Sequence, residues 1–436
     1  MFKPRPSFVI VLSFLGVILA GAILLMLPIS SAQGKVTNFL DAYFTANSAT
    51  CVTGLVVLDT GTYFSLFGLL VILCLIQIGG LGYLTFSTFL VLIFRHRMFV
   101  SEKLIMMEAL NLYSAKDVIT VLRKIFTIVF TIEGIGALIL FLRWLPELGF
   151  SKALLYGIFH SVSAFCNAGF SLPANYASLT PYVGDWIINL TITSLIIIGG
   201  IGFVVIVDLL QNRRRSLHTK IVLSTTAFLL IVGTLLFFIL EANNPKTLGP
   251  LSFPQKVLAS YFQAVTPRTA GFNTVDMGSL STAAALLLMI LMFIGASPGG
   301  TGGGIKTSTF TLVVATIWAT LRNYRDTILF NRRIPAETVR RAFTIAALSL
   351  TLVAISTFLL TSQKIELTKA AFEVFSAFGT VGLSMGITPY LSPIAKVVII
   401  ITMFIGRVGP LTLLLALTLG QKERKTEPPK EGISIG

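Results

Sequence analysis

The chain has 436 residues, of which 55% are hydrophobic and 12% are charged, and its formal net charge is +15. Several apolar runs approach the length of about 20 residues that crosses a membrane, which excludes an ordinary soluble protein and predicts a polytopic helical membrane protein. A membrane β-barrel would instead show alternating segments of about ten residues. The three cysteines show neither metal-ligand spacing nor a disulfide framework. The apolar runs include Phe8–Ile29, Ile125–Leu140, Ile221–Leu240 and Ile345–Leu360.

Basic residues gather in clusters between the apolar runs. If the membrane spans alternate in direction, all of these clusters lie on one side, as the positive-inside rule describes. We therefore expect the net charge to reflect membrane topology, not nucleic-acid binding, and both termini to face the cytoplasm. The first apolar run is too long for a signal-peptide core, so it is read as a span. The clusters are Lys3–Arg5, Arg95–Lys124, Arg213–Lys220, Arg322–Arg341 and Lys422–Lys430.

A fourfold internal repeat organises the chain. Four segments align on a glycine that is followed by Leu or Phe, and an aromatic residue stands ten positions before each glycine. A second apolar run with its own glycines follows each segment, so each unit reads as a span, a short amphipathic helix, a glycine motif and another span. The aligned segments are SATCVTGL (Ser48–Leu55), SAFCNAGF (Ser163–Phe170), VTPRTAGF (Val265–Phe272) and SAFGTVGL (Ser376–Leu383).

Four such units predict an all-α membrane protein with eight transmembrane helices and four re-entrant pore loops around one central pore. The helices that lead to the glycines, such as Asn38–Thr50 and Leu154–Phe165, are too short to cross about 30 Å of hydrocarbon at 1.5 Å per residue. Non-helical backbone at that depth must be buried in protein or line a watery cavity, which four loops achieve by converging on one axis. The expected units are residues 1–94, 95–212, 213–325 and 326–421, followed by a cytoplasmic tail at 422–436.

The four loops predict a pathway for a monovalent cation. A ring of backbone carbonyls can replace the hydration shell of such an ion, and glycine admits positive φ without strain, so that successive carbonyls face one axis. Apart from cysteine, Arg268 is the only ionisable side chain in the motifs, and a ring without carboxylates argues against divalent ions. We expect no catalytic residue, no resident metal and no cofactor. The predicted filter residues are Val52, Thr53, Gly54, Asn167, Ala168, Gly169, Thr269, Ala270, Gly271, Thr380, Val381 and Gly382.

A glycine-rich stretch interrupts the second apolar run of the third unit. That run extends from about Leu280 to Leu321, roughly twice what one crossing needs. A break at Gly295–Gly304 divides it into two half-helices joined by a loop. Five glycines among residues 299–304 permit many backbone conformations of similar energy, so a small input can switch the loop.

Two basic side chains lie inside the predicted membrane segments near this stretch. Arg407 stands in the fourth unit at the register of the other units' glycine clusters, and a buried arginine in a span marks a functional site. We expect carbonyl oxygens of the glycine-rich loop to be its partners, and its fixed charge to oppose cations beside the pore. Lys306 either caps one state of the loop or extends its ammonium group to the cytoplasmic surface.

These motifs resemble a known family. The repeat pattern is similar to that of the Ktr, Trk and HKT superfamily of cation transporters. The strings GASPGGTGGGIKTSTF and IGRVGPLTL look like signatures of the membrane subunit of bacterial Ktr systems. The resemblance covers roughly residues 5–420. The two extra N-terminal spans that Trk subunits usually carry are absent, which favours the Ktr type.

The resemblance implies one pore per subunit, in a bacterial inner membrane, with no enzymatic activity. Glycine at all four filter positions goes with potassium preference in this family, while a sodium-transporting member and sodium as an activator stay open. It further implies a homodimer on a cytosolic ring of nucleotide-binding subunits, which would be a separate chain because no G-x-G-x-x-G follows a strand here. A secondary solute transporter is the less favoured alternative. The implied gate consists of Gly299, Gly300, Thr301, Gly302, Gly303, Gly304, Lys306 and Arg407.

Weaker expectations concern side chains around the filter. Arg268 and Glu373, in adjacent units, could form a strut behind it, while His160 is expected to be a packed residue of a pore helix. Cys51 and Cys166 share one register and are expected to lie behind the filter. Carboxylates on the outer side either enrich cations at the mouth or are ordinary loop charges. They are Asp41, Asp59, Glu147, Asp185, Glu241, Asp276, Glu366 and Glu373.

Overall fold

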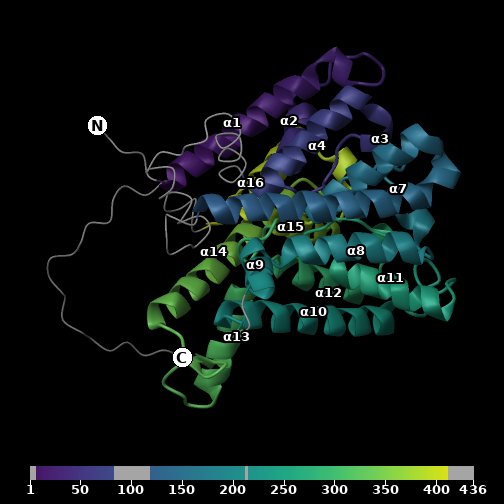
Figure 1. Cartoon of the computed structure of the whole chain (residues 1–436). Helices are drawn as coiled ribbons and strands as arrows, with labels where there is room; N and C mark the ends of the chain where they lie inside the picture. The colour runs from purple at the N-terminus through teal and green to yellow at the C-terminus, as the bar shows by residue number, and fades with distance from the viewer. Residues whose placement is uncertain (1–5, 83–117, 212–214, 411–436) are drawn as a thin grey trace, which may run out of the picture.

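The computed structural model describes residues 6–82, 118–211 and 215–410. These residues are mostly helical, as predicted, and their only strands form one short hairpin, β1 (Ile328–Leu329) with β2 (Arg332–Arg333). The longer helices run roughly side by side (Figure 1). The basic clusters beyond these ranges and the tail at 422–436 lie outside the described residues.

The first unit shows the predicted order of a helix, a shorter helix, a glycine loop and another helix. α2 has only 12 residues, and Asn38 caps its start by accepting a hydrogen bond from the Leu40 amide at 2.9 Å. Ser65 caps α4 in the same way, accepting from the Gly68 amide at 3.3 Å. The elements are α1 (Pro6–Met26), η1 (Pro28–Ser30), α2 (Phe39–Thr50), α3 (Thr60–Tyr63) and α4 (Leu66–Leu81).

The second unit merges its first helix and its pore helix into one bent element, α7. Pro146 lies inside this 48-residue helix, and Gly149 breaks it with a φ of 72° and a ψ of 171°. Glycine reaches this conformation at no steric cost, so the chain turns there without a separate loop. The elements are α7 (Val118–Phe165), η2 (Thr180–Tyr182), α8 (Trp186–Gly200) and α9 (Phe203–Gln211).

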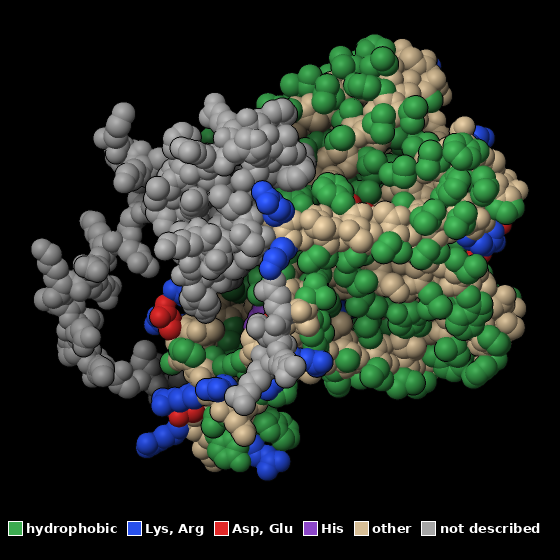
Figure 2. Space-filling model, viewed as in Figure 1, with side chains coloured by type: hydrophobic (Ala, Val, Ile, Leu, Met, Phe, Trp, Pro, Cys, Tyr) green, Lys and Arg blue, Asp and Glu red, His purple; other side chains and the backbone are tan. Residues whose placement is uncertain are grey.

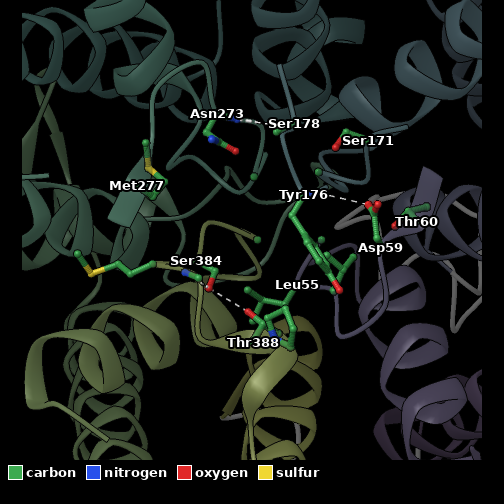
Figure 3. Close-up of a pocket in the computed structure, with 18 of the residues that line it drawn as sticks. Leu55, Asp59, Thr60, Ser171, Tyr176, Ser178, Asn273, Met277, Ser384 and Thr388 are labelled. Atoms are coloured by element: carbon green, nitrogen blue, oxygen red, sulfur yellow. Dashed lines mark hydrogen bonds between the residues drawn. The ribbon is translucent and has the colours of Figure 1, made fainter. Parts of the chain in front are cut away.

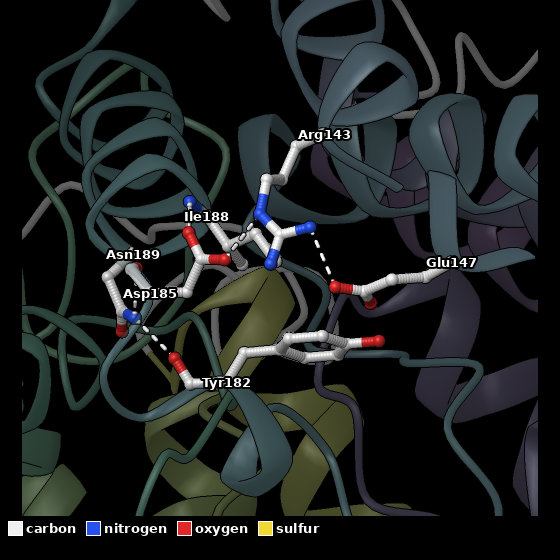
Figure 4. Close-up of polar contacts among 6 residues, drawn as sticks. All are labelled: Arg143, Glu147, Tyr182, Asp185, Ile188 and Asn189. Carbon is white, nitrogen blue, oxygen red and sulfur yellow. Dashed lines mark hydrogen bonds and ion pairs between the residues drawn. The ribbon is translucent and has the colours of Figure 1, made fainter. Parts of the chain in front are cut away.

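A polar clamp fixes the bend of α7 against the start of α8 (Figure 4). The Arg143 guanidinium bonds the Asp185 carboxylate at 2.6 Å and the Glu147 carboxylate at 2.7 Å. Asp185 also caps α8 by accepting from the Ile188 amide at 3.0 Å. Two of the outer carboxylates, Glu147 and Asp185, therefore serve the fold.

The third and fourth units repeat the order of the first. In the third, the second apolar run is broken as predicted: α12 ends at Phe293 and α13 begins at Thr307. The elements are α10 (Leu217–Glu241), α11 (Phe253–Val265), η3 (Met277–Ser279), α12 (Thr282–Phe293), α13 (Thr307–Leu321), α14 (Ala336–Thr361), α15 (Leu367–Gly379), η4 (Thr388–Tyr390) and α16 (Pro393–Val408).

Membrane-spanning capacity is unevenly distributed among the described helices. Three are long and apolar enough to cross a membrane, within α7, α10 and α14, and the pair α8 and α9 adds a fourth that is bent by 94°. The apolar parts of α1, α4, α12 and α13 are shorter than a full crossing. Eight spans therefore remain a prediction.

The interior is built around the short helices that lead to the glycine motifs. Three of the four aromatic residues that stand ten positions before the glycines, Phe44, Phe159 and Phe372, are fully buried. The fourth, Tyr261, is half-buried. Buried aromatic side chains contribute the largest apolar areas to a core, so the repeated aromatic anchors three of the short helices.

Candidate ion pathway

The structure brings the four aligned glycines together in a closed ring. A methyl group built on each glycine would lie within 3.0 Å of a carbonyl oxygen of the following loop, and the fourth loop returns to the first. No side chain fits at these positions without a shift of the neighbouring main chain. The contacts run from Gly54 to Ala168, from Gly169 to Ala270, from Gly271 to Val381 and from Gly382 to Thr53.

Each loop has the same unusual backbone conformation. The glycine and the residue two positions before it both have positive φ, which is uncommon for residues other than glycine. Alternation of left-handed residues with ordinary ones turns successive carbonyls toward one side. The non-glycine residues are Val52 (φ 56°), Asn167 (58°), Thr269 (73°) and Thr380 (50°), and the glycines are Gly54 (87°), Gly169 (71°), Gly271 (79°) and Gly382 (98°).

Hydroxyl groups at the ends of the short helices hold this conformation. In the first and fourth loops, the aligned glycine donates its amide to Ser48 Oγ at 3.1 Å and to Ser376 Oγ at 3.0 Å. In the second and third loops, Ser163 and Thr266 donate to the carbonyl of the residue after the glycine, at 2.8 and 2.6 Å. The sequence analysis did not predict these hydrogen bonds. A serine six positions before three of the four glycines could have indicated them.

An outer cavity of about 330 Å³ opens above the ring, and all four glycines line it (Figure 3). Two of the predicted outer carboxylates, Asp59 and Asp276, also line it. Asp59 joins two units, because it accepts from the Asn175 amide at 2.8 Å and from Thr62 Oγ1 at 2.7 Å. Carboxylates around a mouth raise the local concentration of cations.

The remaining outer carboxylates do not line this cavity. Asp41 pairs with Lys396 at 2.6 Å, and Glu366 pairs with Lys369 at 3.4 Å. Glu241 accepts from the Ser281 amide at 2.9 Å and so stabilises the start of α12. These groups therefore serve the fold: Asp41 joins α2 to α16, and the other two stabilise contacts within their own units.

The glycine-rich loop lies against the inner side of the ring. Its Gly303 amide donates to Thr380 Oγ1 at 2.9 Å, and a side chain on Gly302 would overlap Thr269. Other amides of the loop donate to helix ends: Ser297 to the Gly200 carbonyl at 3.0 Å, Thr301 to Gly199 at 3.2 Å and Gly304 to Gly406 at 3.3 Å. Through these bonds the loop contacts the second and fourth units next to the ring of glycines.

Two half-buried basic side chains bind the carbonyls of this loop. Arg407 donates from Nη1 to the Thr301 carbonyl, as expected, and from Nη2 to the Gly79 carbonyl of α4. Lys306 donates from Nζ to the Gly302 carbonyl at 2.6 Å, so of its two possible roles the contact with the loop is the one present. The two side chains together connect the loop to α16, α4 and the start of α13.

The expected strut between Arg268 and Glu373 is wrong. Glu373 is fully buried and instead accepts from Ser384 at 2.8 Å and from Thr388 within its own unit. Arg268 Nε has no hydrogen-bond partner among the described residues. Arg268 and Glu373 belong to adjacent units, but this did not make them partners. The Glu373 carboxylate instead accepts hydrogen bonds from hydroxyl groups of its own unit.

The expectation for His160 is confirmed, and both cysteines of the shared register are buried. His160 is packed within α7, where its Nδ1 lies 2.8 Å from the Tyr156 carbonyl and its Nε2 accepts from the Leu172 amide at 3.3 Å. Cys51 and Cys166 are fully buried. Cys166 lies against Gly80 of α4, where a side chain would overlap its sulfur.

A buried carboxylate of α7 was missed. Glu133 accepts from Gln77 Nε2 at 3.2 Å on each oxygen and from Cys166 Sγ at 3.7 Å, so it ties α4 to the second filter loop. Glu133 could have been found in the sequence, because it is the single acidic residue within the apolar run at 125–140. An ionisable residue inside a membrane segment is a functional candidate by default.

Comparison with known proteins identifies the family. A family model described as TrkH, cation transport protein, matches residues 4–425. The chain belongs to the TrkH family. Its cation-transport class excludes an enzyme, and its fold is that of a polytopic membrane transporter.

Named transport proteins resemble the chain along nearly its whole length. The chain is 46% identical over 431 residues to Ktr system potassium uptake protein B of Bacillus subtilis (strain 168), covering 98% of this chain and 96% of that protein. It is 39% identical to potassium/sodium uptake protein NtpJ of Enterococcus hirae, covering 99% and 97%. The crystal structure of the potassium transporter TrkH from Vibrio parahaemolyticus shares the fold, with a TM-score of 0.75 at 20% identity, covering 96% and 86%.

Proposed function

We propose that the chain conducts potassium across the membrane through the ring of main-chain carbonyls formed by its four filter loops. Closure of the ring carries the proposal, because each filter glycine abuts a carbonyl of the next loop and the last returns to the first. Eight membrane-spanning helices, arranged as the four units 1–94, 95–212, 213–325 and 326–421, would surround this pore.

Potassium is the favoured ion for two reasons. The ring offers neutral carbonyl oxygens and no carboxylate, which suits a weakly hydrated monovalent cation. Relatives from Bacillus subtilis and Vibrio alginolyticus are named potassium uptake proteins. The relative from Enterococcus hirae is named for potassium and sodium, so sodium is the second candidate ion.

The loop at 299–304 is the proposed gate of this pore. It lies beneath the filter residues, and Arg407 and Lys306 bind its carbonyls. Two positive charges beside the pathway oppose the passage of a cation. Flux therefore requires the loop and its two cations to move away from the pore axis.

The chain is proposed to work with other components in a bacterial inner membrane, with both termini in the cytoplasm. Relatives are named as proteins of a Ktr system, which supports a multi-component assembly. A homodimer bound to a cytosolic ring of nucleotide-binding subunits fits this proposal. The chain then needs no cofactor, and sodium acts at most as an activator.

Uptake of radioactive rubidium into proteoliposomes loaded with potassium tests the proposal. We expect uptake without ATP or any organic solute, with external potassium competing better than sodium. Gly54→Ser should weaken that preference, since a side chain would displace the facing carbonyl. Uptake that requires an organic co-substrate would instead indicate a secondary transporter, and stronger competition by sodium would indicate a sodium pathway.

A further inference from the structure

A groove of about 600 Å³ lies between α10 and α13. Its lining is mostly apolar, and five of the large lining side chains are exposed: Phe228 (59%), Val314 (48%), Trp318 (58%), Tyr324 (66%) and Ile328 (62%). Such exposure is unfavourable in water and ordinary in contact with acyl chains. An apolar, outward-facing groove in a membrane transporter therefore suits a lipid tail.

Two arginines contact residues that line this groove. The Arg322 guanidinium lies 5.0 Å from the centre of the Trp318 ring, and Arg333 pairs at 2.9 Å with Asp326, which lines the groove. The hairpin places Arg332 and Arg333 opposite Leu329 and Ile328. Residues 322–333 contain four arginines and one acid. Hydrophobic and basic side chains lie together at the lower edge of the molecule, where Figure 1 places α13 and the hairpin (Figure 2).

A short chain of hydroxyl contacts connects the groove to the glycine-rich loop. Thr311, which lines the groove, bonds Thr225 of α10 at 2.6 Å and the Thr307 carbonyl at 2.8 Å. Thr307 Oγ1 in turn lies 2.9 Å from Ser297 Oγ of the loop. Any occupant that holds α13 against α10 therefore also holds the start of α13, from which the loop departs.

We propose that this groove binds an anionic phospholipid that regulates the gate. One acyl chain lies along α10 and α13, and the phosphate lies between Arg322 and Arg333. Apolar lining next to an arginine cluster matches both parts of such a lipid. The regulatory part rests on the proposed function: an occupant that holds α13 against α10 also holds the start of α13 and, through Thr307 and Ser297, the loop beneath the ring, so it stabilises this closed conformation and lowers flux.

Rubidium uptake in two kinds of vesicle tests this proposal. We expect uptake in phosphatidylcholine vesicles to exceed uptake in an equal mixture of phosphatidylcholine and phosphatidylglycerol by about fivefold or more, the usual lower range for such coupling. The double variant Arg322→Gln/Arg333→Gln should abolish the difference. The matched variant Arg340→Gln/Arg341→Gln removes the same charge from α14 and should preserve it.

Two further measurements separate the possible occupants. Mass spectrometry of the purified protein should count bound phosphatidylglycerol on the wild type and less on Ala315→Trp, which fills the groove without changing charge. If Ala315→Trp changes the oligomeric mass and not lipid binding, the groove is an interface between copies and the lipid proposal is overturned. Equal uptake in both vesicles overturns the regulation alone, whereas no uptake in either overturns the proposed function.

Discussion

Replacing Gly169 by serine tests the carbonyl ring at one of its four contacts. The new Cβ would lie 2.6 Å from the Ala270 carbonyl oxygen and 3.0 Å from Gly271 Cα. Ordinary van der Waals contact needs about 3.5 Å, so one of the two loops must move by about 0.9 Å. Gly169 also has a φ of 71°, which costs a residue with a side chain about 1–2 kcal/mol.

This displacement should appear as lost ion discrimination. Overpacking of this kind costs about 1–3 kcal/mol, and the cheapest relief is rotation of the carbonyl away from the new side chain. If about 1.4 kcal/mol of that cost appears as weaker coordination of potassium relative to sodium, discrimination falls about tenfold. We therefore expect the permeability ratio of potassium to sodium to decrease by about tenfold or more.

Reversal potentials with potassium on one side of a bilayer and sodium on the other measure that ratio directly. Gly34→Ser is the matched control, because Gly34 has a φ of 66° and nothing within 4 Å of a new Cβ. Gly34→Ser carries only the free-energy cost of a positive φ, without a steric overlap. It should therefore keep the wild-type permeability ratio of potassium to sodium. An unchanged ratio in a well-folded Gly169→Ser protein would refute the assignment of the ring as the filter.

Three other substitutions probe the supports of the ring and the gate. Arg407→Ala, or deletion of residues 299–303, should raise rubidium flux about tenfold, since a charged hydrogen bond contributes about 1.5–3 kcal/mol; equal or lower flux with normal folding would contradict the gate. Ser376→Ala should lower the stability in thermal unfolding by about 1–3 kcal/mol, because the amide of the fourth filter glycine loses its acceptor; an unchanged Tm would show that this bond is dispensable. Glu133→Ala should lower Tm more than Glu133→Gln, which keeps an acceptor for Gln77, and equal effects would mean that the hydrogen bond is not what matters.

The repeated features of the fold could be predicted from the sequence because their geometry restricts which residue types can occupy certain positions. A loop with positive φ and a neighbouring main chain within contact distance admits only glycine, so Gly54 and its three counterparts appear as a register. A break inside an over-long apolar run likewise has to be rich in glycine. The boundary of α12 at Phe293 lies close to the predicted break.

Features that depend on the partner unit were not predictable. The string at Ile198–Gly202 predicts a glycine-rich helix end, but not the bend of 94° between α8 and α9. The bend is stabilised from outside, because the Phe203 amide donates to the Gly299 carbonyl of the glycine-rich loop at 3.0 Å. Sequence spacing within one unit contains no information about a bond made to another.

The hydroxyl ties show a third kind of limit. In the third unit valine occupies the position of the repeated serine, and Thr266 one residue later takes over its role. A strict alignment would have called this tie lost. The hydrogen bond is kept in the structure because consecutive residues at the end of a short helix both lie close to the loop that follows it.

Closure of the ring within one polypeptide has a consequence for mixtures of intact and inactive copies. If a pore were assembled from four separate chains, its activity in such a mixture would be proportional to the fourth power of the intact fraction. Here every intact copy contains all four loops of the ring. Co-reconstitution with a blocked variant should therefore lower total conductance in simple proportion to its share. In a cell that makes both kinds of copy, the intact copies would therefore keep their full share of the ion flow.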